Sequence, residues 1–249
     1  MKRIASVVLA AVAVAAVVVP SSASARGSKM LMIKDCKKQT ATVLVPQEQA
    51  QALLPKGFTA TGGPNGNEEA VWLYFITKTC GSEASPTLET FESHVGVHPP
   101  KKYANKQGSD FYQFDLGVEG SKAAAFAKHV CMTDVIDEAQ IDASVTTDGV
   151  SPAAVADAAA EIEGPVTASM TVRGLGFESE SSGLTRMFYT GGSKPRFYDY
   201  ITGQSYFSMG QSTITFAEPY LGLQTVNASL GLVQLQTLVY ERPKSCLGK

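Results

Sequence analysis

The alternation of apolar and polar positions predicts a chain built mostly of strands. Residues 71–76 form a continuous apolar and aromatic run, and within residues 89–98 Glu92, His94 and His98 share one face of an expected strand. On these grounds we expect strands at residues 40–45, 71–76, 89–98, 110–116, 166–173, 184–190, 212–216 and 233–241. The Gly, Ser and Pro residues between them indicate the turns of an antiparallel sheet or barrel.

Three short helices are expected beside the sheet. Pro46 suits the first turn of a helix that Pro55-Lys56-Gly57 ends, and Ser121 is a good N-cap for the alanine-rich residues after it. Ser151-Pro152 opens a second alanine-rich helix, which Gly164-Pro165 closes. Because there is no internal repeat and no long linker, residues 26–249 are predicted to form a single domain of the α+β class, mainly β.

The first 25 residues have the three parts of a secretory signal peptide. Lys2 and Arg3 supply a positive start, residues 7–19 are continuously apolar, and Ala23-Ser24-Ala25 is a small-x-small cleavage pattern. The apolar run is too short to span about 30 Å of hydrocarbon as a helix, and no cysteine near the cleavage site suits a lipid anchor. We therefore expect a secreted protein, extracellular or in the periplasmic and cell-envelope space, that begins near Arg26 and has no membrane anchor.

Export bears on the cysteines, because an even number of them in an oxidising compartment favours disulfides. The four are Cys36, Cys80, Cys131 and Cys246, and their spacing leaves all three pairings open. No two have Cys-x-x-Cys spacing, so we expect no zinc site. The formal net charge of −2 becomes −4 once the two basic leader residues are removed, and without a basic excess nucleic acid is not an expected partner.

The segment from Glu92 to His98 carries candidate ligand-binding side chains. A helix would place His94 and His98 on one face at the spacing of a zinc site, but the valines, Gly96 and the two prolines that follow favour a strand. On a strand, Glu92, His94 and His98 share one face, and about 13 Å separates the histidines, too far for one metal ion. This polar face either lines a cavity or faces solvent.

Lys101 and Lys102 are the candidate catalytic residues. Adjacent lysines depress each other's pKa, and a desolvated lysine forms a Schiff base with a carbonyl substrate. The alternative is a solvated loop, which the polar residues 105–108 favour.

Arg173 and Arg186 lie within predicted strands, where an arginine has to pair with an acid or reach water. In a pocket, the planar guanidinium would recognise a carboxylate. The aromatic residues concentrated between 188 and 220 fit an apolar or carbohydrate-stacking pocket, or ordinary cross-strand pairs. No nucleophile elbow, phosphate-binding loop or dinucleotide fingerprint occurs, and we expect no cofactor.

Residues 43–58, VLVPQEQAQALLPKGF, run from a strand through a short helix to a Leu-Pro-x-Gly turn. An apolar strand at 71–76, Gly96-Val97-His98 and the strand at 110–116 follow in that order. In these features, between residues 42 and 130, the chain resembles the acetoacetate decarboxylase superfamily. The resemblance implies an antiparallel cone-like β-barrel with a central cavity and a few short peripheral helices.

The decarboxylases of that family form a Schiff base between a β-keto acid and a lysine of a Pro-Lys-Lys motif. Here Pro100-Lys101-Lys102 precedes the strand at 110–116, whereas the family's motif follows the strand matched to it. The segment where the motif is expected contains His129, Cys131 and Asp134 instead. The resemblance therefore implies a barrel that has lost the family's nucleophile.

The leading hypothesis is a secreted protein that holds a small organic ligand in its cavity without decarboxylase activity. The residues expected to contact this ligand are Glu92, His94, His98, Arg173 and Arg186. The alternative is a Schiff-base β-keto acid decarboxylase or related carbon–carbon lyase, with Lys101 or Lys102 as nucleophile and Glu92 as proton shuttle. A second alternative is an extracellular protein-interaction module, which would expose an apolar patch on the order of several hundred Å².

Overall fold

The computed structural model describes residues 30–64, 69–82, 85–104, 108–130, 137–164, 166–180, 183–190, 195–203 and 205–241. The predicted leader, together with Cys131 and Cys246, lies outside the described residues. The strands are β1 (Met30–Pro46), β2 (Thr59–Ala60), β3 (Ala70–Ser82), β4 (Ser85–His98), β5 (Ser109–Glu119), β6 (Asp137–Glu138), β7 (Gln140–Thr147), β8 (Val155–Glu163), β9 (Ala168–Glu180), β10 (Gly183–Thr190), β11 (Pro195–Thr202), β12 (Ser205–Tyr220) and β13 (Leu223–Glu241). The helices in this part of the chain are α1 (Gln47–Ala52) and α2 (Ala123–Val130).

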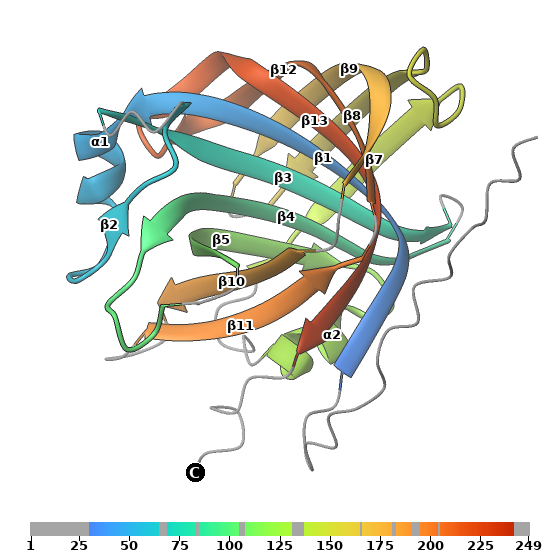
Figure 1. Cartoon of the computed structure of the whole chain (residues 1–249). Helices are drawn as coiled ribbons and strands as arrows, with labels where there is room; N and C mark the ends of the chain where they lie inside the picture. The colour runs from blue at the N-terminus through green and yellow to red at the C-terminus, as the bar shows by residue number, and fades with distance from the viewer. Residues whose placement is uncertain are drawn as a thin grey trace, which may run out of the picture.

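Seven strands close into a ring (Figure 1). Their order is β1-β3-β4-β5-β10-β11-β13, and β13 pairs again with β1. Neighbours in the ring are antiparallel except β5 and β10, which run parallel. β13 is long because it serves two neighbours along one edge: its end from Leu238 to Glu241 pairs with β11, and its earlier part pairs with β12.

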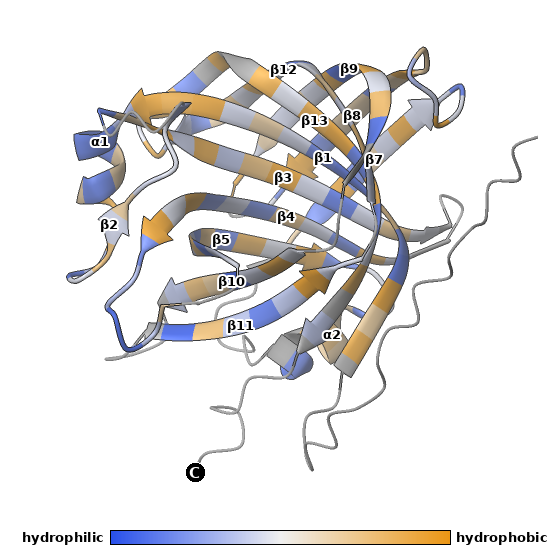
Figure 2. Cartoon of the chain, in the orientation of Figure 1, coloured by the Kyte–Doolittle hydropathy of each residue, from blue (hydrophilic) through white to orange (hydrophobic). Residues whose placement is uncertain are grey.

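Beyond the ring, the sheet continues from β13 through β12, β9 and β8 to β7. This extension forms a second layer, because β7 contacts β3, β4 and β5 across the larger hydrophobic core. Hydrophobic and hydrophilic bands both occur along the long strands (Figure 2). On β8 exposed and buried residues alternate, so that strand turns one face to the larger core, whereas β3 and β4 are buried on both faces and contribute to both cores. A smaller core fills part of the ring interior and includes Cys36, Cys80, Leu116 and Tyr198.

The predicted fold class is confirmed, since the described chain is mostly β with short helices and mainly antiparallel pairing. Each of the eight predicted strands has a counterpart, although most are longer than predicted. The helix expected between Ser151 and Gly164 is wrong, because this segment contains β8. On β8 the residues at every second position are buried, and burial of this face outweighs the helix propensity of alanine.

The two other helices are confirmed, and both are short. α1 follows Pro46, and its glutamine side chains fasten it: Gln47 Nε2 donates to the carbonyl of Ala60 at 3.0 Å, and Gln49 Nε2 to that of Leu221 at 3.1 Å. α2 packs against β13 and β4, where the ring of the fully buried Phe126 lies 4.9 Å from that of Tyr240. Neither of the helices described here has the length and apolar character needed to cross a membrane.

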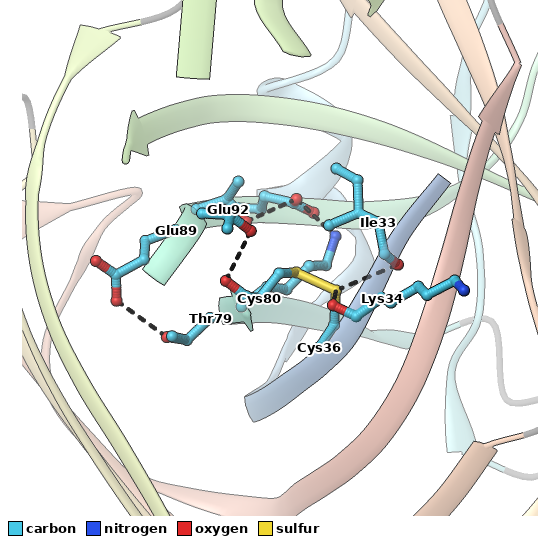
Figure 3. Close-up of a disulfide and its surroundings, with 10 residues drawn as sticks. Ile33, Lys34, Cys36, Thr79, Cys80, Glu89 and Glu92 are labelled. Carbon is cyan, nitrogen blue, oxygen red and sulfur yellow. Dashed lines mark hydrogen bonds and ion pairs between the residues drawn. A yellow bond between two sulfur atoms is a disulfide. The ribbon is translucent and has the colours of Figure 1, made fainter. Parts of the chain in front are cut away.

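Cys36 and Cys80 form a disulfide between β1 and β3 (Figure 3). The two cysteines are direct partners in the antiparallel register and are 44 residues apart in sequence. Both are buried in the smaller core. The structure thus supports the predicted use of cysteine in disulfides and selects one bond from the pairings that the spacing left open.

β7 is the last strand of the extension, so its outer edge faces no further strand in the described part of the chain. Side chains from the other layer bind this edge. Glu119 Oε2 accepts a hydrogen bond from the backbone N–H of Ile141 at 2.7 Å, and Lys37 Nζ donates to the carbonyl of Val145 at 3.2 Å. These two bonds satisfy backbone groups that a neighbouring strand would otherwise pair.

Candidate functional site

A buried ion pair lies inside the ring. Lys78 of β3 and Glu92 of β4 face the interior, and Lys78 Nζ lies 2.6 Å from Glu92 Oε1. The two side chains are only 3% and 0% exposed. Thr90, two residues before Glu92 on the same face of β4, donates to the same carboxylate oxygen at 3.2 Å. Full burial strengthens the attraction within this pair, since charges attract more strongly away from water.

Tyrosine side chains surround the pair from the opposite wall of the ring. Lys78 Nζ lies 5.2 Å from the centroid of the Tyr200 ring, a cation–π arrangement, and Tyr198 donates from its hydroxyl to Gln113 Oε1 at 3.1 Å. Burial alone would lower the pKa of Lys78, but the negative charge of Glu92 outweighs it and the pKa is raised. Lys78 is therefore an ammonium ion at neutral pH.

His94 is also buried in the ring, two residues beyond Glu92 on β4. Its ring contacts the aromatic rings of Tyr74 and Phe111, with centroid distances of 5.2 and 4.9 Å. Burial lowers the pKa of His94 well below its ordinary value, and the positive charges of Lys38 and Lys78 lower it further. The imidazole is consequently neutral at pH 7.

Three buried polar atoms on the ring face of β1 and β4 have no hydrogen-bond partner among the described residues. They are Thr40 Oγ1, Glu92 Oε2 and His94 Nδ1. A buried polar group without a partner costs free energy, so such groups usually meet an ordered water or a ligand. These atoms give the ring interior an unused capacity for hydrogen bonding.

Solved structures share this arrangement of strands. The enduracididine biosynthesis enzyme MppR, with HEPES buffer bound, superposes with a TM-score of 0.51 at 11% identity over 84% of either chain. MppR complexed with pyruvate gives 0.51 at 12% identity over 84% of this chain and 87% of that one. An acetoacetate decarboxylase gives 0.50 at 8% identity over 85% and 86%.

The fold is that of acetoacetate decarboxylase-like enzymes. At these identities the likeness concerns the fold. No family model matches the chain, and no curated protein matches it.

The acetoacetate decarboxylase-like fold brings only part of the predicted ligand set together. Glu92 and His94 lie side by side in the ring, as one face of a strand predicts. His98 lies at the exposed end of β4, opposite Thr59 of β2. Arg173 is exposed on β9, in the second layer, so it lies apart from the ring interior.

Arg186 of β10 points away from the ring interior. It links β10 to β11 and to the turn that follows β4. Its guanidinium forms two bonds to Asp199, Nε to Oδ1 at 2.7 Å and Nη2 to Oδ2 at 2.8 Å, and Nη1 donates to the carbonyl of Tyr103 at 2.7 Å. It also stacks over Phe197, 4.3 Å from the ring centroid. These contacts hold the turn after β4 against the ring.

Lys101 and Lys102, the predicted nucleophiles, lie on that turn, and both are exposed. Lys102 Nζ lies 4.6 Å over the ring of Tyr103. Neither lysine has the desolvated surroundings that Schiff-base chemistry requires. The aromatic segment at 188–220 supplies mostly buried side chains, among them Phe188, Tyr189 and Tyr198, although Tyr206 is 41% exposed.

Sequence reasoning missed Lys78. The predicted strand ended at Ile76, and the polar residues that follow have the composition of a turn. β3 in fact continues to Ser82, and Lys78 takes the same face as Cys80. The one available signal is the alternation Thr77-Lys78-Thr79-Cys80, which keeps the period of two.

A second polar cluster lies on the opposite face of β4. The hydroxyl of Tyr220 lies 2.6 Å from Ser93 Oγ and donates to Asp115 Oδ2. Ser93 and Asp115 are direct partners on β4 and β5, and Tyr220 is at the end of β12. Burial raises the pKa of Tyr220, and the bond to Asp115 raises it further, so the phenol stays protonated. This cluster joins the two layers.

Proposed function

We propose that this is an exported protein of acetoacetate decarboxylase-like fold that binds a small organic ligand inside its ring, without decarboxylase chemistry at a lysine. The observation that supports binding is the set of unpaired polar atoms on β1 and β4: Thr40 Oγ1, Glu92 Oε2 and His94 Nδ1. A ligand that donates to Glu92 and contacts His94 would satisfy them.

The charges around the ring interior favour a ligand with a negative group. Lys38 and Lys78 are opposite each other on β1 and β3, and both act on His94. Glu92 pairs with Lys78, and His94 adds no positive charge at neutral pH. A small hydroxy acid would combine a carboxylate, attracted by these positive charges, with a hydroxyl group that donates to Glu92 Oε2.

The protonation of Lys78 argues against a Schiff base at this position. Attack on a carbonyl needs a free amine lone pair, and the contact with Glu92 keeps the proton on Nζ. Among the lysines in the described part of the chain, Lys78 is the buried one, and Lys101 and Lys102 face solvent. Lys78, Lys101 and Lys102 thus lack the neutral, desolvated amine of a carbon–carbon lyase.

Borohydride trapping tests the absence of lysine chemistry. The purified protein is incubated with acetoacetate or pyruvate, reduced, and weighed intact by mass spectrometry. We expect the mass of the unmodified chain. A stoichiometric reduced adduct that peptide mapping places on Lys78, Lys101 or Lys102 would overturn this part of the proposal.

Binding is tested by calorimetric titration with acetoacetate, pyruvate and lactate. We expect at least one to bind, and His94→Phe, which keeps the aromatic packing, to weaken binding tenfold or more. The matched control is His98→Phe, at the exposed end of the same strand, which should bind like the unaltered protein. No binding of any of the three, or equal effects of the two variants, would contradict a ligand site in the ring.

The leader at residues 1–25 and the Cys36–Cys80 disulfide support export. To test export, the full chain is expressed in an export-competent host, and the N-terminus of the product is sequenced. We expect a mature chain that begins near Arg26. A product that keeps residues 1–25 and stays inside the cell would contradict export.

A further inference from the structure

The exposed face of β7, β8, β9 and β12 carries a hollow of about 740 Å³. This face is turned away from the larger core, since Asp157 and Ala159 alternate along β8 with the buried Ala156, Ala158 and Ala160. The larger core and strands β3 to β5 therefore separate it from the ring interior. Its volume falls in the range of roughly 300–1,000 Å³ that small-molecule sites have.

Two rows of residues cross the four strands and form the floor of the hollow. The first row, from β7 to β12, is Thr146, Asp157, Arg173 and Gln211, and the second is Ser144, Ala159, Thr171 and Thr213. Glycine allows β9 and β12 to approach closely here, because a Cβ on Gly210 would collide with the carbonyl oxygen of Arg173. The floor is therefore a dense array of hydroxyl, amide, carboxylate and guanidinium groups.

The two charges in this array balance each other. Arg173 Nε lies 3.8 Å from Asp157 Oδ1, and the side chains are 69% and 57% exposed. A pair this open and this long is weak, so either group can exchange its partner for a ligand. The other side chains that line the hollow are uncharged. The hollow thus offers many donors and acceptors but no net charge, which suits a neutral ligand with many hydroxyl groups.

A hollow of about 280 Å³, lined mainly by apolar residues but also by Glu178, lies beside the polar one. Leu175 and Met209 line it, and they are direct partners in the row that follows Arg173 and Gln211. They are 68% and 47% exposed. A ligand that spans both hollows would place hydroxyl groups on the polar rows and C–H surface on these two side chains.

We propose that this face is a second binding site and that it takes a neutral carbohydrate, whose sugar rings combine hydroxyl edges with apolar C–H faces. Arg173 and Asp157 make the central hydrogen bonds, and Leu175 and Met209 contact a C–H face. The site is independent of any ligand in the ring.

Titration with cellotetraose, chitotetraose and maltotetraose tests the proposal, with saturation-transfer NMR as the readout of contact. We expect at least one tetrasaccharide to bind, and Arg173→Gln or Leu175→Ser to lower its affinity tenfold or more. Lys122→Gln, which removes an exposed cation before α2, is the matched control and should leave binding unchanged. Circular dichroism verifies that all variants are folded.

Three outcomes would overturn the proposal. The first is that none of the three tetrasaccharides binds. The second is binding that Arg173→Gln and Leu175→Ser leave unchanged, because the ligand would then lie elsewhere. The third is tighter binding of a charged probe, spermine or citrate, that Arg173→Gln or Asp157→Asn abolishes, since the hollow would then select charge rather than hydroxyl groups.

Discussion

Lys78–Glu92 and Arg173–Asp157 both join side chains from neighbouring antiparallel strands, but their surroundings differ completely. The first pair is sealed in the ring at 2.6 Å, and the second is open to solvent at 3.8 Å. Water and salt screen the open pair. In the buried pair, each charge has lost its hydration and is stabilised by the opposite charge. A lysine–glutamate pair in the ring therefore has a structural role, whereas the arginine–aspartate pair on the exposed face can exchange its internal contact for contacts with a ligand.

Breaking the closed pair should give the largest effect. Glu92→Gln leaves the Lys78 ammonium buried without a counter-charge, and we expect the free energy of unfolding at pH 7 to fall by about 3–5 kcal/mol. Urea denaturation followed by circular dichroism measures it. The double variant Lys78→Met, Glu92→Leu removes both charges and should recover most of the loss. A loss below about 1 kcal/mol for Glu92→Gln would show that the pair is hydrated.

The Tyr220 cluster lies between these extremes, because it is partly buried and contains one carboxylate, that of Asp115. Tyr220→Phe removes the bonds to Ser93 and Asp115 and leaves both without this partner. We expect a loss of about 1–3 kcal/mol in the same denaturation experiment. Tyr206→Phe, at a position 41% exposed, is the control and should change little. Equal effects of the two variants would mean that the cluster does not hold the layers together.

Mild acid should destabilise the folded protein through His94 in the ring. Because the pKa of His94 is lowered in the folded protein, the unfolded chain binds the extra proton first, below pH about 6.5. Below that pH, the free energy of unfolding decreases by up to about 1.4 kcal/mol for each unit by which the pH is lowered. Lys78 adds nothing in this range, since its raised pKa keeps it charged in both states until well above neutrality.

The comparison of His94→Phe with His98→Phe isolates this effect between pH 6.5 and 5.5. Only the first variant should lose the slope. The difference also separates His94 from Glu89, whose pKa burial raises and which therefore acts in the opposite direction. Identical slopes for the two variants would assign the acid sensitivity to another group.

Removing the open pair should have the smallest effect. Arg173→Gln or Asp157→Asn is expected to change the free energy of unfolding by less than about 0.5 kcal/mol. Thermal and urea denaturation at low and high salt measure it. A loss above about 1.5 kcal/mol would erase the contrast between the two pairs and make Arg173 a structural residue.

The strands were predictable where their pattern was strong. On β4, side chains point alternately to the two faces of the sheet, so Glu92 and His94 lie on the same face. Their proximity to each other follows from this alternation alone. β8 was predicted wrongly because its buried residues are mostly alanine, which marks a helix as readily as a strand. The deciding factor was the burial of alternate alanines in the larger core, which depends on contacts with distant strands and cannot be recognised from the local sequence.

The candidate site was less predictable than the fold, since it depends on strand pairing. Whether Arg173 faces a ligand pocket, an acid or solvent depends on which strands lie beside β9, and the order β8-β9-β12 is not written in the local sequence. The parallel contact of β5 with β10 is similarly non-local, although it places Arg186 beside the turn that carries the two lysines. Lys78 was missed because the sequence does not distinguish a buried lysine from an exposed one unless its ion-pair partner is known.

The side chains that bind β7 also govern how copies of the protein meet. An open strand edge is a template on which a second chain can add and a third can follow. Glu119 and Lys37 reach this edge from the opposite layer and occupy one donor and one acceptor that such growth would need. An incoming strand would have to displace both bonds, so these two side chains oppose the addition of further chains at this edge.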